Sequence, residues 1–230
     1  MAWLDDIIQL NLTDDQFYKE ENEKKQIVLH HTVSGPSAEN VISYWQDNQE
    51  RVATAILIDR RGKIYQCFSS KYWGHHLGIK ETFLKKQGFS DYKSRNILLN
   101  KQSIAIEIIS WGGLVKSNDK YYPAIWDKGK YVANTKVKPI PLSEVFISET
   151  PFRDFKYFQK YTDKQIESVK NLLILWNQKY NIPLTYNNTM WNVSKDALNG
   201  NSGVWTHVSY REDKSDCFMQ EELITMLKTL

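Results

Sequence analysis

Runs of apolar residues predict five strands in this chain. Residues 27–29 and 103–110 are almost wholly apolar, a pattern typical of buried strands. Residues 54–59 and 64–68 flank a short turn that contains a glycine, which predicts a β-hairpin. Residues 203–209 predict a last strand near the end of the chain. The isoleucine-rich run 103–110 is expected at the centre of the sheet.

Apolar residues at helical spacing predict helices between and after these strands. Residues 41–45 predict a helix that packs on the sheet. A longer helical pattern begins at Thr162, which forms the sequence signature of a capping box with Gln165. Residues 220–230 carry apolar side chains in helical register. The chain therefore alternates between the two kinds of element.

This order of elements predicts an α/β fold in a single domain, with a central mixed β-sheet flanked by helices. Residues 1–26 are polar and charged, so we expect an N-terminal extension that is partly helical. The domain itself is expected over residues 27–230. A long insertion at about 112–160 is rich in aromatic residues, Gly and Pro. We expect short strands in it, because structureless loops of that length are uncommon in compact domains.

Composition excludes several classes of protein. The chain is 41% hydrophobic, which is far from the signature of disorder. Its net charge of +3 lacks the strong basic excess of a nucleic-acid-binding protein. No run of about 18 apolar residues occurs, so we expect no transmembrane helix. The start MAWLDDIIQL lacks the basic residues of a secretory signal, and the two cysteines, Cys67 and Cys217, suit free thiols rather than a disulfide framework.

Histidines at predicted strand ends are candidate metal ligands. His30 closes one buried strand, and His207 lies near the end of another. A catalytic zinc ion is typically bound by three protein side chains and a water molecule. His30, His207 and either Asp216 or Cys217 would complete such a set. The sequence therefore predicts a zinc site in a cleft at the strand ends of the sheet.

Glu107 is a single charge inside the apolar run 103–110. A buried carboxylate is unfavourable unless it is paired or functional. Two interpretations follow: a buried ion pair, or a general base beside the metal.

Four segments, in this order, resemble those of zinc-dependent N-acetylmuramoyl-L-alanine amidases of type 2, a family that includes phage lysozymes of amidase type and peptidoglycan recognition proteins. They are IVLHHT (27–32), YWGHHLG (72–78), NKQSIAIEI (100–108) and THVSYREDKSDC (206–217). The resemblance implies hydrolysis of the amide bond between N-acetylmuramic acid and L-alanine in bacterial peptidoglycan, with one Zn²⁺ ion as cofactor.

The resemblance also assigns metal ligands. His30 matches the first zinc ligand of the family and His207 the second. The third ligand in the family is Asp or Cys, often two positions after a lysine. Lys214 stands in that relation to Asp216, so the resemblance selects Asp216. Because side chains alternate along a strand, we expect His31 to point away from His30 and to pack against its neighbours.

The same resemblance implies two catalytic residues. Glu107 matches the inward glutamate of the family's central strand, which would act as general base. Lys214 would stabilise the oxyanion, as its family counterpart is thought to do. Some relatives use a tyrosine in the proton-handling role. The matching position here is Thr54, which favours the glutamate.

Three further residues are candidate substrate contacts. His76 is the member of the pair 75–76 that we expect to face the substrate. Trp73 and Trp111 are candidate sugar platforms, because an aromatic face covers the apolar side of a sugar ring. Ordinary core packing is the alternative interpretation for each tryptophan.

The expected biological setting combines the resemblance with two features of the sequence: no secretory signal and no separate wall-binding domain are recognised in it, a pattern typical of a phage endolysin. We expect a monomeric, phage-type endolysin that is made in the cytoplasm and reaches the cell wall after release by another protein. A recycling enzyme and a secreted effector are alternative settings. A non-catalytic peptidoglycan-binding module and a zinc peptidase that cuts the stem peptide are alternative functions. The aromatic insertion is a candidate source of wall specificity.

Overall fold

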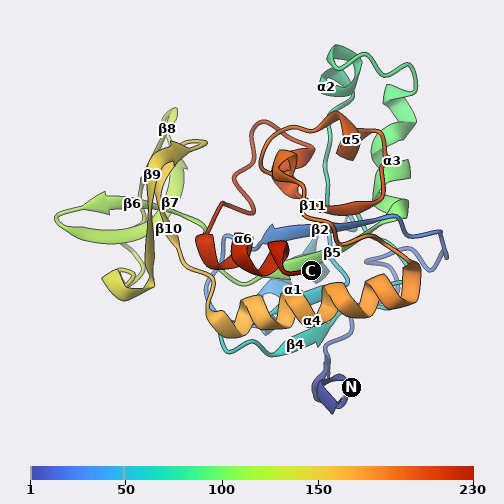
Figure 1. The fold of residues 1–230 in the computed structure, drawn as a ribbon. Helices are drawn as coiled ribbons and strands as arrows, with labels where there is room; N and C mark the ends of the chain where they lie inside the picture. Colours follow the sequence, from blue (N-terminus) through green and yellow to red (C-terminus); the bar gives the residue numbers. More distant parts are fainter. Residues whose placement is uncertain (1, 49) are drawn as a thin grey trace.

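A six-stranded mixed sheet forms the centre of the molecule in the computed structural model of the chain, which describes residues 2–48 and 50–230 (Figure 1). The predicted α/β fold, one domain with a mixed sheet flanked by helices, is confirmed. The strands of this sheet, in spatial order, are β1 (Ile8–Gln9), β4 (Ile64–Gln66), β3 (Ile56–Ile58), β5 (Ser103–Ile108), β2 (Gln26–His31) and β11 (Gly203–Thr206).

Strands β5, β2 and β11 run parallel to one another, and this places their carboxyl ends at one edge of the sheet. Every residue of β2 is buried, as expected for a strand with neighbours on both sides. His30 of β2 lies opposite Glu107 of β5 in the register. Strand β11 pairs with β2 and ends at Thr206. The sheet thus brings His30, Glu107 and the residue after Thr206 to the same edge.

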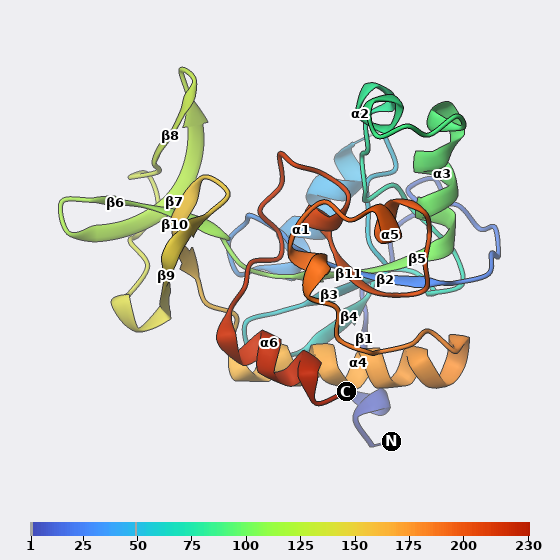
Figure 2. The same ribbon diagram turned by 45° about the horizontal axis from the view of Figure 1, so that its top comes forward.

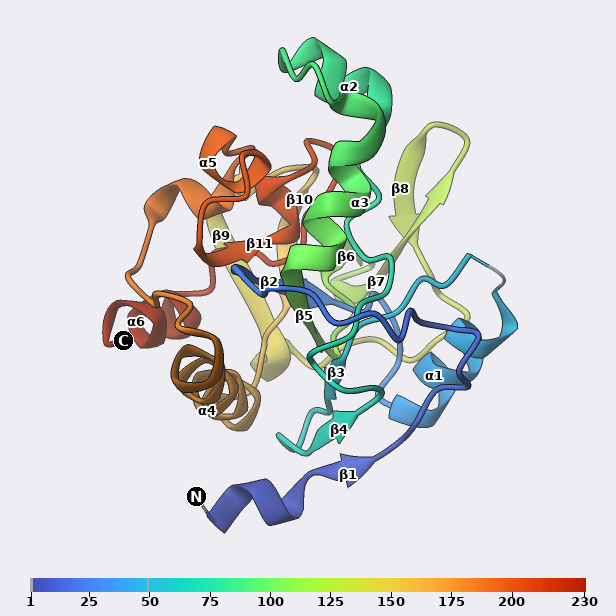
Figure 3. The same ribbon diagram turned by 90° about the vertical axis from the view of Figure 1, so that its right-hand side faces the viewer.

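Helices cover both faces of the sheet. Figures 2 and 3 show α4 (Asp163–Tyr180) and α6 (Glu221–Lys228) on one face and α1 (Ala38–Asp47) on the other. The predicted capping box of α4 is confirmed, because Thr162 accepts from the backbone of Gln165 and the Gln165 side chain accepts in return. The helices are α1 (Ala38–Asp47), α2 (Glu81–Lys86), α3 (Tyr92–Gln102), α4 (Asp163–Tyr180), α5 (Lys195–Leu198) and α6 (Glu221–Lys228). Within residues 2–48 and 50–230, no helix has the length and apolar character that crossing a bilayer requires.

The N-terminal extension is part of the fold. A 3₁₀ turn over Ala2–Asp6 leads into β1, which pairs in parallel with β4 at the edge of the sheet. Leu12 and Phe17 are buried in the main core. The extension therefore adds an edge strand to the sheet and covers apolar surface behind it.

The insertion contains strands, as its sequence predicts, and these strands form a sheet of their own. Five antiparallel strands stand apart from the central sheet, beside α6 (Figure 1). Phe158 stacks on Phe218 with ring centroids 4.3 Å apart, and this contact ties the insertion to the domain. In spatial order the strands are β8 (Lys130–Ala133), β7 (Lys120–Asp127), β6 (Gly113–Ser117), β10 (Phe155–Gln159) and β9 (Val145–Phe152).

The last strand of the central sheet is shorter than predicted. It ends at Thr206, and His207–Ser209 form a 3₁₀ turn instead. The Ser209 hydroxyl lies 3.2 Å from the backbone nitrogen of Thr206 and accepts its hydrogen bond. This bond closes the turn that His207 opens directly after the strand.

Candidate metal centre and active site

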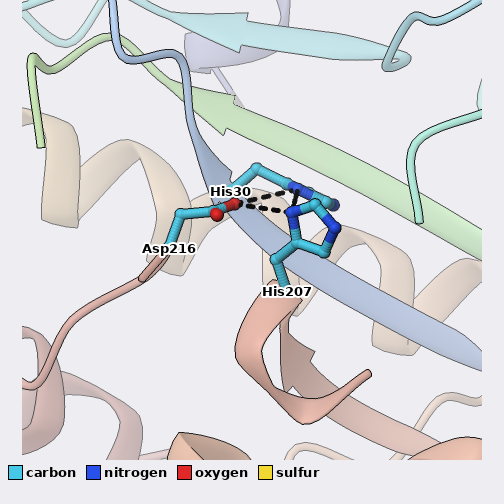
Figure 4. Close-up of side chains that lie close together, drawn as sticks. All are labelled: His30, His207 and Asp216. Carbon is cyan, nitrogen blue, oxygen red and sulfur yellow. Dashed lines mark hydrogen bonds and ion pairs between the residues drawn. The ribbon is translucent and has the colours of Figure 1, made fainter. Parts of the chain in front are cut away.

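Three side chains converge at the carboxyl edge of the central sheet (Figure 4). The Nδ1 atoms of His30 and His207 are 3.1 Å apart, and Oδ2 of Asp216 lies 3.2 Å from the first and 2.9 Å from the second. All three residues are buried. They come from β2, from the turn after β11 and from the loop before α6, so the fold brings together ligands that are distant in sequence.

Hydrogen bonds determine which nitrogen of His30 carries the proton. The carbonyl of Leu99 can only accept a hydrogen bond, so the Ser103 hydroxyl donates to it at 2.7 Å. Ser103 Oγ then accepts from Nε2 of His76 at 2.8 Å. Nδ1 of His76 is left as an acceptor, and it accepts a hydrogen bond from Nε2 of His30 at 3.0 Å. His30 therefore presents the lone pair of Nδ1 to the other two ligand atoms.

His207 is oriented in the same way. Its Nε2 donates to the carbonyl of Leu77 at 2.9 Å, which leaves the lone pair on Nδ1. Two lone pairs 3.1 Å apart, beside a carboxylate, repel one another unless a cation lies between them. The donor set therefore fits a metal ion. Imidazole nitrogen and carboxylate oxygen both bind zinc, and three protein ligands leave a fourth position for water or substrate.

The protonation states suit this site. Burial and the neighbouring His207 lower the pKa of His30 to about 4, so the ring is neutral at pH 7. A metal ligand has to be a neutral imidazole or an ionised carboxylate. The neutral ring of His30 meets this condition without a change in protonation.

The neighbours of His30 and Asp216 in sequence face another direction. The ring of His31 lies against Tyr161, with Nδ1 2.8 Å from the phenol oxygen. Cys217 is buried beside the same Tyr161, and burial raises the pKa of its thiol well above the ordinary value. A thiol held in this protonated state is a poor metal ligand. The geometry thus groups Asp216, and not Cys217, with the two histidines.

Glu107 and Lys214 lie in the same cleft as the three ligand residues, which has a volume of about 480 Å³. Burial raises the pKa of Glu107 well above its ordinary value; the charge of Asp216 adds to this, and Lys214 opposes it. One carboxyl oxygen, Oε2, is buried without a hydrogen-bond partner in the described protein. Such an acceptor beside a metal site is available to a water molecule or a substrate.

The family model described as N-acetylmuramoyl-L-alanine amidase matches residues 20–217, which is most of the chain. The chain belongs to this amidase family. The match begins inside the N-terminal extension and includes the whole insertion. The amidase is thus an enzyme that hydrolyses an amide bond.

Solved structures similar to the amidase share little sequence with it. PlyL is 14% identical with a TM-score of 0.49, and the match covers 96% of each chain. The N-acetylmuramoyl-L-alanine amidase LysC from Clostridium intestinale is 13% identical with a TM-score of 0.45, over 93% of this chain and 89% of that one. The hydrolase AmiA from Staphylococcus aureus is 13% identical with a TM-score of 0.48, over 96% and 81%. No curated protein matches the sequence.

The predicted substrate contacts of the amidase fall in three different places. His76 lines the cleft, but both of its ring nitrogens are engaged by His30 and Ser103. Trp73 is 5% exposed and stacks on Tyr18, with centroids 3.9 Å apart. The structure therefore does not bring Trp73 to the cleft, because the N-terminal extension covers its ring.

Trp111 is not among the residues that line the cleft either. Its ring is partly buried against a small apolar cluster of the insertion that contains Leu114 and Val145. The edge of the ring lies against Gly35, which lines a neighbouring hollow of about 480 Å³. Trp111 therefore stands behind the hollow and supports its wall.

Tyr44 and Arg211 also line the cleft, and neither is a candidate site residue from the sequence. Tyr44 of α1 is 71% exposed and lines both the cleft and the neighbouring hollow, which also share Glu107. Arg211 lines the cleft and is held by two bonds to Asp213, at 2.9 and 2.6 Å. The sequence carries one signal for Tyr44: it is an aromatic residue that lies outside the buried apolar face of α1.

Proposed function

We propose that the amidase cleaves the bond between N-acetylmuramic acid and L-alanine in peptidoglycan with one zinc ion held by His30, His207 and Asp216. The observation that carries the proposal is the convergence of two proton-free imidazole nitrogens and a carboxylate oxygen in a cleft. Glu107 lies in the same cleft with an oxygen that has no protein partner. This set of groups suits metal-assisted amide hydrolysis.

Each residue of the site has a separate role in the proposed hydrolysis. A zinc ion held by His30, His207 and Asp216 would polarise the carbonyl and lower the pKa of water. Glu107 takes a proton from the attacking water and passes it to the nitrogen of the leaving L-alanine. The products are a lactyl carboxylate on the sugar and a free amine on the peptide. Lys214 stabilises the oxyanion that forms at the attacked carbonyl.

His76 acts in this scheme as a positioning residue and not as a substrate contact. Its Nδ1 accepts the proton of His30 Nε2, which fixes the ring and the tautomer of His30. Ser103 holds His76 in turn.

The test is mass spectrometry of fragments released from purified peptidoglycan by zinc-loaded protein, with a chelated sample as control. Free stem peptides with L-alanine at the amino end, absent after chelation, are the expected result. Peptides cut internally would instead identify a zinc peptidase. Equal release with and without the chelator would exclude the metal from the reaction.

We also propose that the amidase acts as a phage-type endolysin. The support is the amidase family to which the chain belongs. Expression in a bacterial cytoplasm with and without a pore-forming membrane protein tests this setting. Lysis that requires both proteins is expected. Growth that continues when both are present would argue against it.

A further inference from the structure

The insertion presents an exposed aromatic surface at the hairpin of β7 and β8. Trp126 is 64% exposed, although a side chain of this type is usually largely buried. Tyr131 lies opposite it across the hairpin, and the two ring centroids are 4.9 Å apart. Both rings line a hollow of about 590 Å³ that shares no residue with the catalytic cleft. The hollow is therefore a separate surface of the molecule.

Basic side chains surround these rings. Lys116, Lys130 and Lys156 line the hollow, against one acidic residue, Asp154. Lys130 and Lys156 are exposed, and neither has an ion-pair partner in the part of the chain that the structure describes. We call Trp126, Tyr131, Lys130 and Lys156 the hairpin platform. Its two cations are free to face an anionic ligand.

The insertion carries the positive charge of the whole chain. Residues 112–160 hold nine Lys or Arg and five Asp or Glu, whereas the remainder holds 21 and 22. The segment thus has a net charge of +4 by these counts, and the rest of the protein has −1. A polyanion is therefore attracted to the insertion rather than to the catalytic domain.

A row of packed rings holds the platform in place. Tyr131 lies 4.5 Å from Phe155, which lies 5.8 Å from Phe158 between ring centroids. Phe158 stacks on Phe218, two residues after the metal-site Asp216. The first ring of the row, Trp126, is exposed, and the last, Phe218, is fully buried in the core near the metal site. The platform is thus rigid, which lowers the entropic penalty of binding.

We propose that the hairpin platform binds the glycan strand of peptidoglycan, with the rings under the sugars and the lysines facing the carboxylates of the strand. The inference rests on the proposed function in one respect: cleavage converts each lactyl amide into a lactyl carboxylate. Every peptide removed therefore leaves one new lactyl carboxylate on the glycan itself, in place of a bulky peptide. The platform binds the product strand more tightly than the substrate and keeps the enzyme on the wall between cleavages.

The experiment measures binding of soluble glycan strands, freed of all stem peptides, by calorimetry at low and moderate salt. Trp126→Ala is expected to raise Kd about tenfold, the equivalent of one lost ring contact. The double variant Lys130→Gln, Lys156→Gln is expected to raise Kd at low salt and to reduce the salt dependence of binding. The matched controls Leu98→Ala and Lys93→Gln, at exposed positions of α3, should leave Kd unchanged.

A second measurement separates the platform from the active site. Hydrolysis of a soluble fragment with one disaccharide and one stem peptide should be the same in all these variants. Unchanged Kd in both platform variants would overturn the inference. So would binding of a phosphate-rich polyol polymer when glycan strands do not bind. Wild-type protein that binds strands but does not cleave the fragment would refute the proposed function and leave the platform in place.

Discussion

The Nε2 atom of His30 lies 3.0 Å from Nδ1 of His76, on the side of the His30 ring away from the metal site. His76 is anchored through Ser103 to a backbone carbonyl, which cannot reverse its role. The direction of the hydrogen bonds is therefore set by the fold. A backbone acceptor outside the cleft thus controls which nitrogen of His30 is available to a metal.

We expect His76→Phe to weaken zinc binding about 10- to 100-fold, the usual effect of losing a partner of a metal-bound histidine. Phenylalanine has a similar shape but cannot accept the His30 proton. Zinc Kd by competition with a chromogenic chelator measures the effect. His75→Phe is the matched control, because the His75 ring contacts Tyr18 at 3.3 Å and not His30. Equal zinc affinity in the two variants would contradict the role of His76.

The sequence predicted the central sheet because its strands obey local rules. Strands β2 and β5 are apolar runs, and their parallel pairing follows from burial on both sides. Strand alternation separated His30 from His31 in advance, and the two rings do face different partners. The resemblance to known amidases selected Asp216, which spacing alone could not separate from Cys217.

Other features could not be predicted, because they depend on contacts between distant residues. Trp73 was a candidate sugar platform, but Tyr18 of the extension covers its ring. Helix α3 carries no apolar stripe, and only Leu99 and Asn100 are buried in it, so helical spacing gave no signal. The strands of the insertion alternate only weakly between apolar and polar residues, because one face of the sheet packs on Phe218 and parts of both faces are exposed. Their pairing could therefore not be predicted from the sequence.

Glu107→Gln is expected to retain zinc and to lower turnover about 10²- to 10⁴-fold, the range for loss of a general base. The pH dependence of the free energy of unfolding, measured on the metal-free protein, provides a second test. The raised pKa of Glu107 means that the folded state binds more protons than the unfolded state above about pH 4.5. Wild-type stability therefore falls as pH rises, relative to the variant. Turnover near that of wild type would remove Glu107 from the mechanism.

Asp216→Ala and Cys217→Ala form a matched pair at adjacent buried positions. We expect the first variant to lose stoichiometric zinc, because a carboxylate ligand is removed. The second should retain it, because the thiol lies beside Tyr161 and is not part of the group formed by His30, His207 and Asp216. Metal content of purified protein by elemental mass spectrometry distinguishes the two. The opposite pattern would assign the third ligand to Cys217.

Lys24 makes the stability of the protein depend on pH above neutrality. It is 3% exposed, and its ammonium donates to the carbonyls of Tyr72, Lys101 and Ser103 at 2.8, 2.7 and 3.2 Å. Burial still lowers its pKa to about 7. Between pH 7 and about 10 the unfolded state therefore binds more protons, so the free energy of unfolding rises with pH.

The measurement is urea unfolding of wild type and Lys24→Met at pH 7 and pH 9. The difference between the two proteins should shift in favour of wild type as pH rises, by up to about 1.4 kcal/mol per pH unit. Other titrating groups cancel in this difference. A difference that does not change with pH would show that the three carbonyls keep Lys24 fully charged.

Phe158 links the insertion to the loop that carries Asp216. It is fully buried and stacks on Phe218, which stacks in turn on Tyr161 at 4.6 Å. Phe158→Leu removes the ring but keeps the site apolar, so we expect a loss of about 1–3 kcal/mol in stability and a higher zinc Kd.

The matched control is Tyr157→Leu, which removes a ring from the other face of the same sheet, where Tyr157 packs against Tyr121 at 5.0 Å. It should lower stability without changing zinc Kd, since that face has no contact with Phe218 among the ring pairs of the described residues. Thermal melts of the metal-free proteins and zinc titrations separate the two effects. A zinc Kd that rises equally in Phe158→Leu and Tyr157→Leu would mean that the metal site responds to the stability of the insertion as a whole, and not to the Phe158–Phe218 contact.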